Sequence, residues 1–488
     1  MSRKVIIIGA GIAGLTAAVY AQRSGFDVTL IEQHGIVGGM CTSWKRKGYF
    51  FEGAMHWLIG SSPKTEAYQI WKDTGALSDN VPVLLSSPFY SVEQEGQILY
   101  FYRDIEKTAE HLSAISPDDA PLLQKLVKDV KAAGKMNMPV FDVKGLKTEN
   151  PKKMSFGLLL KMLPLIPLMG RLGKITCGDY AKRFKHPGIP RLFRFVPDEY
   201  TATSLIFTLA QLHSGDGGYP KGGSLPMAQR MAKTFKDLGG KLILNTRVQK
   251  VNIQDGKATG VTLPTETLNA DAVIVTQETI AALSSLFDTP PQDTWLSEIR
   301  NTAKSAICTF IGVGVKAEIS ATPEWTLAEP IHYAGNTVSE LGFYNYTGYE
   351  GYAPEGCTTL TTVFMGDTYD FWKQAKADGR YEAEKQALAE QISRALCEKY
   401  PNCEGNIEVI DIATPLTYER YTGAYHGSWM TALEPGDKMK QYPGTCESIE
   451  GLYFAGHRII PPGGHPGAAV SGRQAAQLVC RQFGAVFK

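Results

Sequence analysis

The start of the chain alternates between short apolar runs and a helical pattern. Residues 5–8 form an unbroken run of β-branched side chains, which is typical of a strand buried on both faces of a parallel sheet. Residues 15–21 carry small and apolar side chains in a helical pattern, and residues 28–31 repeat the buried-strand pattern. The order of strand, helix and strand predicts an α/β fold organised around a parallel sheet.

The same alternation returns in two later parts of the chain. There it predicts a helix over 225–238, strands over 241–244, 248–253, 258–263, 270–276 and 452–455, and a helix over 466–483. We therefore predict one nucleotide-binding domain that is assembled from residues 1–60, 216–284 and 441–488.

The two intervening stretches lack this alternation. Their patterns predict helices over 68–74, 105–115, 122–133 and 384–397, a hairpin over 89–102, and strands over 307–315 and 358–365. A mixture of this kind predicts an α+β substrate domain, built from residues 61–215 and 285–440 and interleaved with the first domain.

A glycine motif follows the first predicted strand. Gly9, Gly11 and Gly14 have GxGxxG spacing, and Glu32 stands at the end of the second strand. Gly9 allows a tight turn, Gly11 lets the backbone approach a pyrophosphate, and Gly14 lets the helix pack closely on the strand. The helix N-terminus attracts phosphates, and the Glu32 carboxylate can accept the hydroxyls of an adenosine ribose. The motif predicts a bound adenine dinucleotide.

The far end of the chain favours FAD over NAD. The predicted strand over 452–455 ends at Gly456, and a helix follows shortly after it. FAD proteins of the glutathione-reductase type complete their site with such a C-terminal strand and helix, whereas nicotinamide domains complete theirs within one contiguous segment. We therefore expect a glutathione-reductase-like FAD-binding Rossmann domain that holds its FAD non-covalently.

Composition narrows the remaining classes of function. The formal net charge of +1 argues against binding of nucleic acid, which requires a concentrated basic face. The eight cysteines include no CxxC pair and read as reduced thiols. We find no paired metal-ligand motif, no nucleophile elbow, no leader peptide and no run of the ~20 apolar residues that span a membrane. These features lead us to expect a cytoplasmic protein, soluble or attached to a membrane surface.

Three segments together resemble one family. They are GAGIAGLTAA to GYFFEGAMHW near the start, GYPKGG at 218–223, and GLYFAGHRIIPPGGHPGAAVSGRQAA from Gly451. In this combination they resemble the phytoene desaturase, carotenoid isomerase and retinol saturase family of FAD-dependent oxidoreductases. The resemblance extends more weakly over the whole chain.

The resemblance implies which residues contact FAD. The positions that match the family's cofactor segments are Gly9, Gly11, Ile12, Ala13, Gly14, Glu32, Gln33, Gly38, Gly39, Met40, Cys41, Met55, His56, Val248, Gly456, His457, Gly464, Pro466, Gly467 and Ala468. Two positions depart from the family. Met40 and Cys41 follow the double glycine where many members carry arginine, and His457 stands where many carry an acid. We transfer no charge contact to Met40 and Cys41, and at His457 we carry over only the backbone N–H contact to the pyrophosphate.

Four residues are candidates for the chemistry. Imidazole titrates near neutrality, so His56, His426 and His465 are candidate acid–base groups, and Tyr425 lies in a segment that resembles the family's cover over the substrate face of the flavin. For each of them a structural role is the competing interpretation.

The resemblance implies an enzyme that acts on carbon–carbon bonds of a lipophilic polyene or isoprenoid, with hydride exchange at flavin N5. Desaturation, saturation and cis–trans isomerisation all stay open. Two alternatives also stay open: a flavin amine oxidase, and a non-catalytic, escort-like binding protein for a prenylated partner.

The stretch over 155–170 is the most apolar in the chain and is flanked by basic residues. One interpretation is a peripheral contact with a membrane surface. The other is a buried helix and loop that line the substrate domain.

Overall fold

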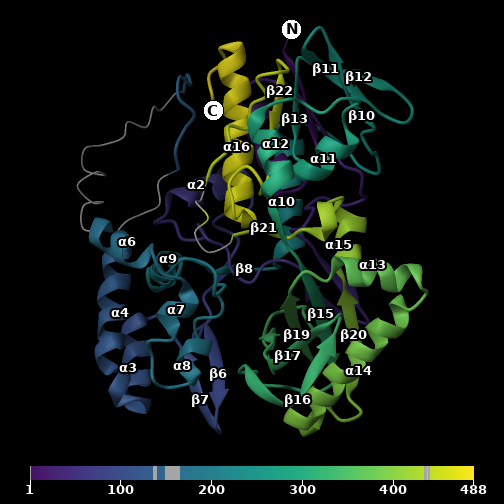
Figure 1. Ribbon diagram of the computed structural model, residues 1–488. Coiled ribbons are helices and arrows are strands. Elements are labelled where there is room, and N and C mark those ends of the chain that lie inside the picture. The colour runs from purple at the N-terminus through teal and green to yellow at the C-terminus, as the bar shows by residue number, and fades with distance from the viewer. Residues whose placement is uncertain (1, 136–139, 149–164, 434–436, 438–439) are drawn as a thin grey trace.

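A computed structural model describes residues 2–135, 140–148, 165–433, 437 and 440–488. Figure 1 shows three parts: a sheet with helices beside both termini, a group of helices at the lower left, and a second sheet at the lower right.

The first part is built on a parallel sheet whose described strands follow the order β22-β13-β1-β2-β9. Its strands are β1 (Lys4–Ile8), β2 (Asp27–Ile31), β9 (Lys241–Ile243), β13 (Ala272–Val275) and β22 (Leu452–Phe454). Three separate stretches of chain thus form one sheet, and the fold is α/β.

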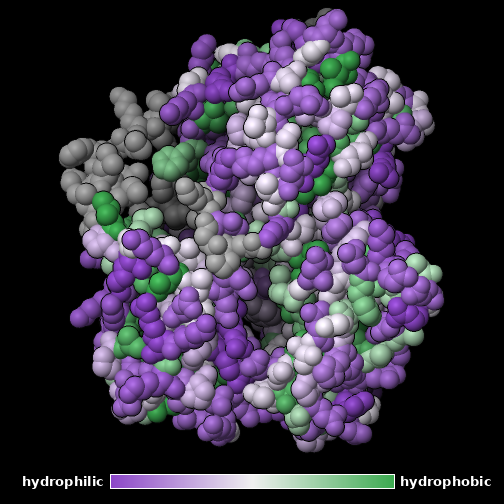
Figure 2. Space-filling view, in the orientation of Figure 1, coloured by the Kyte–Doolittle hydropathy of each residue, from purple (hydrophilic) through white to green (hydrophobic). Residues whose placement is uncertain are grey.

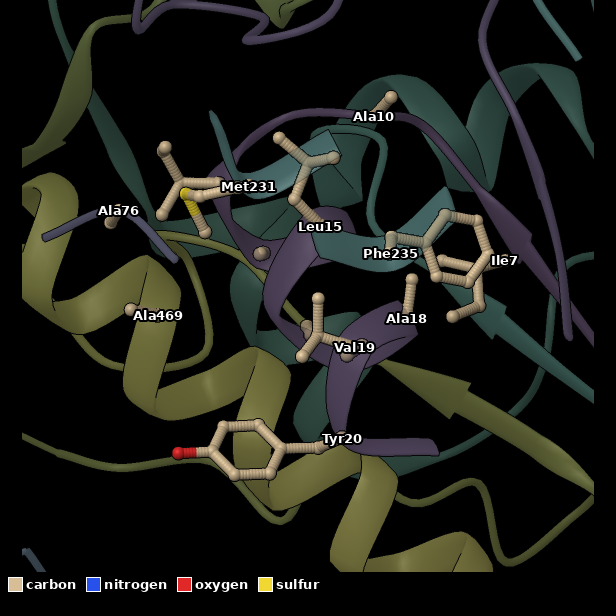
Figure 3. Close-up of a cluster of buried hydrophobic side chains, with 14 of the residues drawn as sticks. Ile7, Ala10, Leu15, Ala18, Val19, Tyr20, Ala76, Met231, Phe235 and Ala469 are labelled. Atoms are coloured by element: carbon tan, nitrogen blue, oxygen red, sulfur yellow. The ribbon is translucent and has the colours of Figure 1, made fainter. Parts of the chain in front are cut away.

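Successive side chains of β1 supply two hydrophobic cores because they point to opposite faces of the sheet. Val5 and Ile7 pack with α1 (Ile12–Arg23), α10 (Ser224–Asp237) and α16 (Gly464–Phe483). Figure 3 shows this cluster, with Leu15, Val19 and Tyr20 projecting from α1 toward residues of the neighbouring helices. Ile6 and Ile8 face a second core, formed with α11 (Thr279–Ser285), α12 (Thr294–Thr302) and the antiparallel strands β10 (Lys250–Gln254), β11 (Lys257–Thr262) and β12 (Thr267–Asn269).

The helical part encloses its own core. It contains the hairpin β6 (Tyr90–Gln94) and β7 (Gln97–Phe101), α3 (Ile105–Ile115), α4 (Ala120–Ala133), α6 (Ile166–Leu172), α7 (Cys177–Ala181), α8 (Gly188–Arg191) and α9 (Ala202–His213). Helix α2 (Glu66–Asp73) packs instead against α16 and adds Ile70 and Trp71 to the first core. Of the apolar stretch over 155–170, residues 155–164 lie outside the described residues. In the remainder, Leu165 and Leu168 are buried whereas Ile166 and Met169 are exposed.

The third part is an antiparallel sheet flanked by long helices (Figure 1). It contains β18 (Tyr344–Asn345), β19 (Thr358–Met365), β15 (Cys308–Val315) and β20 (Ile407–Ala413) in that order, the hairpin β16 (Trp325–Tyr333) and β17 (Asn336–Leu341), and α13 (Tyr369–Ala377), α14 (Tyr381–Lys399) and α15 (Pro415–Thr422). Short strand pairs connect the parts: β3 (Ser43–Arg46) with β4 (Tyr49–Glu52), β5 (Val83–Leu84) with β8 (Tyr219–Pro220), and β14 (Lys304–Ala306) with β21 (Met430–Ala432).

Most predicted elements are present, and their differences from prediction are local. The strand predicted over 248–253 begins at Lys250. Val248 lies in the wall of the cavity described below, and the Gln249 amide donates to the Thr262 carbonyl oxygen of β11 just before the strand starts. The hairpin β16–β17, strand β20 and helix α9 were not predicted. Within the described residues, no helix is long and apolar enough to cross a membrane.

The contact between α1 and α16 gives a first test. A Cβ atom on Gly472 would lie 2.2 Å from the carbonyl oxygen of Ala13, whereas one on Gly170 in α6 would meet nothing within 4 Å. We expect Gly472→Ala to destabilise the protein by about 1–3 kcal/mol through overpacking. Gly170→Ala, the matched control, should be neutral or raise stability by up to ~1 kcal/mol because alanine favours a helix. Equal midpoints of urea unfolding for the two variants would contradict this.

Candidate active site

A cavity of about 1060 Å³ begins at the carboxyl ends of β1 and β2 and continues between the helical part and the second sheet. Figure 2 shows the surface hollowed between these two parts. Clefts at this edge of a parallel sheet are the usual place for a dinucleotide.

The nucleotide end of the cavity is formed by the glycine motif and Glu32. Gly9 has φ +100°, and a Cβ on Gly14 would lie 1.9 Å from the Gly9 carbonyl oxygen, so the turn and the close packing both require glycine. A Cβ on Gly11 would meet only the Gly38 oxygen, at 3.9 Å, which leaves open space beside this backbone. The Glu32 carboxylate accepts hydrogen bonds of 2.8 Å from the Ala10 and His34 amides, and these bonds fix it at the cavity wall.

Two helix N-termini reach the cavity without a side-chain cap. Gly11 is the N-cap of α1, Gly463 is the N-cap of α16, and both residues line the cavity. The unpaired amides of each helix carry partial positive charge, which suits a pyrophosphate at one helix and an electron-rich ring edge at the other.

His56 lies on a loop that a buried carboxylate holds in place. Glu52 accepts hydrogen bonds of 3.1 Å from the amides of Ala54 and Met55, and further bonds from the Tyr219 hydroxyl at 2.6 Å and the Ser224 amide at 2.9 Å. Burial raises the pKa of the Glu52 carboxyl, against the lowering effect of these donors. The loop that carries His56 is therefore held in place by Glu52, which is fully buried.

The His56 ring stacks on Tyr344, with the centroids 4.0 Å apart and the planes 10° from parallel. Both of its ring nitrogens are buried and have no hydrogen-bond partner among the described residues. Burial, followed by repulsion from His465, lowers the pKa of His56 to about 4. The imidazole is thus neutral at physiological pH and keeps an acceptor nitrogen.

Two further histidines line the cavity, His457 after β22 and His465 in the first turn of α16. Burial lowers the pKa of His465 to about 4, and burial together with Arg458 lowers that of His457 to about 4. The His457 Nε2 atom is buried without a partner among the described residues. Three features of the cavity fit a dinucleotide with a flat ring system. They are the unpaired ring nitrogens of His56 and His457, the open space beside Gly11, and the two uncapped helix N-termini.

A buried ion pair closes one side of the cavity. The Arg458 Nε donates to Glu278 at 2.7 Å, and the side chains are 1% and 3% exposed. The remaining guanidinium nitrogens donate to the Lys304 carbonyl oxygen and to the hydroxyls of Ser305 and Ser428. Burial raises the pKa of Glu278, but the guanidinium and the other donors prevail and hold this pKa below its usual range.

The cavity brings together most of the residues that the sequence singled out. Its lining includes Gly9, Gly11, Ile12, Ala13, Glu32, Gln33, Gly38, Gly39, Met40, Cys41, His56, Val248, Gly456, His457, Gly464, His465, Pro466 and Ala468. The lining does not include Gly14, Met55, Gly467, Tyr425 and His426.

The last two are placed elsewhere by the local backbone. His426 has φ +53°, and its ring stacks between Tyr369 at 4.1 Å and Tyr425 at 3.9 Å. The Tyr425 side chain is exposed. The acid–base candidates that reach the cavity are therefore His56 and His465.

Several lining residues were missed by the sequence analysis. Glu278 stands two residues after the predicted strand over 270–276, so its place near the carboxyl end of a parallel strand was a usable signal. Arg458, Tyr344, Phe195 and Phe89 come from irregular segments or short strands, and no local pattern marked them.

Comparison with known proteins gives a consistent result. Residues 12–480 match the family model described as flavin containing amine oxidoreductase. The chain is 24% identical to a phytoene desaturase (neurosporene-forming) of Rhodobacter capsulatus, over 98% of this chain and 94% of the relative. It is 23% identical to a chloroplastic prolycopene isomerase of Daucus carota, over 98% and 80%. A solved putrescine oxidase has a TM-score of 0.59 at 16% identity and covers 99% of both chains, a likeness of fold alone.

The depressed pKa of His56 predicts a pH effect on stability. Its pKa of about 4 in the folded protein lies below the ordinary value of 6.5, so the unfolded chain binds the proton first as the pH falls. The stability that the neutral imidazole contributes above pH 6.5 is therefore lost progressively between about pH 6.5 and 4.

We expect His56→Phe, which keeps a ring against Tyr344, to lose less melting temperature between pH 7 and 5 than the wild type, measured without cofactor. His332→Phe, a change at an exposed histidine of β16, is the control and should follow the wild type. Identical pH profiles for His56→Phe and the wild type would refute the prediction.

Proposed function

The chain belongs to the family of flavin-containing amine oxidoreductases, and we propose that within it this protein acts on carbon–carbon bonds of a lipophilic polyene. Family membership makes it a flavin-dependent oxidoreductase, and the resemblance predicted from its sequence motifs is confirmed by the relatives named above. Whether the protein desaturates, saturates or isomerises its substrate is decided by the experiment below.

We propose that the flavin is FAD and that it is bound non-covalently by residues of 1–60, 216–284 and 441–488. The fixed Glu32 carboxylate and the uncapped helices α1 and α16 support a dinucleotide. Cys41, a thiol in the cavity wall, donates to the Ser224 carbonyl oxygen, and burial raises its pKa, so it stays a neutral thiol. It is therefore not poised to form a covalent link to the ring.

The observation that carries the polyene proposal is an aromatic wall extending away from His56. Trp57 lies edge-on to Phe89 at 5.4 Å, and Phe89 lies edge-on to Phe195 at 5.4 Å. With Tyr344 beneath His56, these rings line the cavity between the helical part and the second sheet. A flat conjugated chain packs well against such ring faces and edges. The names of the relatives, phytoene desaturase and prolycopene isomerase, point to the same substrate class.

The roles that we propose for the protein's own residues follow from their protonation, their burial and their contacts. When bound, the flavin supplies hydride exchange. His56 is neutral and has no partner among the described residues, so one ring nitrogen has a free lone pair that can accept a proton released from a substrate carbon beside it. Glu52 keeps the His56 loop in position, and the aromatic wall orients the polyene substrate and excludes water.

Amine oxidation is the weaker alternative. An amine substrate binds as a cation or must lose its proton near the flavin. Glu52 below His56 is fully buried under four donors, and the cavity carboxylates Glu324 and Glu340 lie at the far end of the aromatic wall from His56. The likeness to putrescine oxidase concerns the fold alone. An escort-like role without flavin is also weaker, because it leaves the orphaned nitrogens and the uncapped helices at the cavity without a purpose.

Removal of the Glu32 carboxylate should weaken FAD binding. Hydrogen bonds to a charged group contribute about 1.5–3 kcal/mol each, so we expect Glu32→Ala to raise the dissociation constant of FAD about 10- to 100-fold. The measurement is titration of the apoprotein with FAD, followed by flavin fluorescence. Glu382→Gln, a change at an exposed carboxylate of α14, should leave the constant unchanged. A Glu32→Ala protein that retains wild-type affinity would contradict a ribose contact.

Turnover tests the proposed reaction. The FAD-loaded protein is incubated without oxygen with a detergent-dispersed polyene series and, separately, with aliphatic amines, and the products are separated by chromatography. A longer conjugated chain identifies a desaturase, a shorter one a saturase, and an unchanged length with altered retention an isomerase. Conversion of amines but not polyenes would overturn the proposal in favour of amine oxidation. A protein that does not take up FAD would favour the escort-like role.

Two histidine variants locate the proton acceptor. We expect His56→Gln to slow polyene conversion by about 10²–10⁴-fold with FAD still bound, the usual range for loss of an acid–base group. His426→Gln should change the rate less than threefold, because that ring stacks on tyrosines outside the cavity lining. Equal rates for the two variants would exclude His56 as the proton acceptor.

A further inference from the structure

The aromatic wall ends at a group of charged residues. Phe195 contacts the Tyr90 ring at 6.4 Å, and the Tyr90 hydroxyl donates to Glu324 at 2.7 Å. Arg194, Glu324 and Glu340 line this end of the same cavity. The contacts thus form a continuous path from His56 along the aromatic rings to this group of charged residues at the opposite end of the wall.

Arg191 and Glu324 in this cluster join the helical part to the second sheet. The Arg191 Nε donates to the Glu324 carboxylate at 3.0 Å, Nη1 donates to the carbonyl oxygen of Glu93 and the side chains of Gln94 and Thr326, and Nη2 donates to the Glu324 carbonyl oxygen. The Glu324 backbone pairs with Ser91 and Glu93. Arg191 is buried and committed to these partners, so it is a structural link.

Arg194 is different. Its guanidinium lies 3.1 Å from the Glu340 carboxylate, and the two side chains are 43% and 33% exposed. Among the described residues no other hydrogen bond or ion pair of the Arg194 side chain is present, so the guanidinium keeps N–H groups that can donate into the cavity. The Glu340 carboxylate also lies 3.8 Å from the Arg191 Nε, and its two oxygens keep acceptor capacity toward the cavity beside these two arginines.

The balance of charge selects the kind of group that fits here. A hydrocarbon end that covers these side chains would strip water from spare donors and acceptors without replacing it, which costs free energy. A carboxylate end would meet Arg194 but would also be repelled by Glu340 and Glu324. An uncharged oxygen, a hydroxyl above all, can accept from Arg194 and donate to Glu340.

We propose that Arg194 and Glu340 form a specificity site for a hydroxyl group at the end of the lipophilic chain. The proposal rests on the proposed polyene function and refines its substrate class to polyenes with an oxygenated end. The hydroxyl occupies the charged end of the cavity while the conjugated chain lies along Phe195, Phe89 and Trp57 toward His56.

Equilibrium binding tests this without turnover. The FAD-loaded protein is titrated with three polyenes of equal length that end in a methyl, a hydroxyl or a carboxylate group, and binding is followed by quenching of tryptophan fluorescence. We expect the hydroxyl-ended polyene to bind roughly tenfold more tightly than the methyl-ended one, the value of one hydrogen bond to a charged group, and the carboxylate-ended one to bind less tightly than the hydroxyl-ended one.

Matched variants assign the preference. Arg194→Leu should reduce the advantage of the hydroxyl below twofold, whereas Arg394→Leu, at an exposed ion pair with Glu329 outside the cavity, should retain it. Glu340→Gln, which keeps the shape of the side chain, should tighten binding of the carboxylate-ended polyene several-fold.

Three results would overturn this inference alone. The wild type could bind the methyl- and hydroxyl-ended polyenes equally, it could bind the carboxylate-ended polyene most tightly, or Arg194→Leu and Arg394→Leu could have equal effects. Failure of all three polyenes to bind would overturn the proposed polyene function, and the hydroxyl site with it.

Discussion

The buried ion pair between Glu278 and Arg458 is the interaction on which the rest of the site depends. Removing one partner of such a pair leaves a charge without compensation and typically costs about 3–5 kcal/mol. Glu278 follows β13, Arg458 follows β22, and the guanidinium also binds the start of β14 and the Ser428 segment. Both charges are compensated in the interior only when the segments after β13 and β22, the start of β14 and the Ser428 segment have come together. The same meeting creates the cavity wall beside α16.

The parts of the fold that could be predicted are those in which neighbouring residues decide the structure. Residues 4–32 combine a buried strand, a glycine turn and an uncapped helix, and each feature acts within a few residues. Gly14 shows this well, because its missing Cβ makes room for the Gly9 carbonyl oxygen only five positions earlier. The turn at Glu95-Gly96 between β6 and β7 was likewise predictable, because a glycine between two strand patterns signals a hairpin turn. In the structure both turn residues adopt positive φ.

What could not be predicted depends on contacts between distant segments. Phe195 belongs to an irregular segment, and only the packing of that segment against Phe89 and Tyr90 turns it into a cavity wall. His426 illustrates the converse case. Its residue type and motif suggested chemistry, yet a left-handed backbone and two tyrosine rings hold it away from the cavity. A motif specifies which side chains are near in sequence, whereas the direction of each one is set by its partners.

The polar groups around the aromatic wall and the approach to α16 fall into two kinds, and this division explains how one cavity can serve both a flavin and an apolar chain. Glu52, Glu278 and Arg191 are buried and satisfied by several fixed partners, so they support the walls without offering charge to a ligand. His56 and His465 face the interior in neutral form because burial lowers their pKa. A neutral ring can lie beside a hydrocarbon at little desolvation cost, whereas a free carboxylate there would bind water and compete with the substrate.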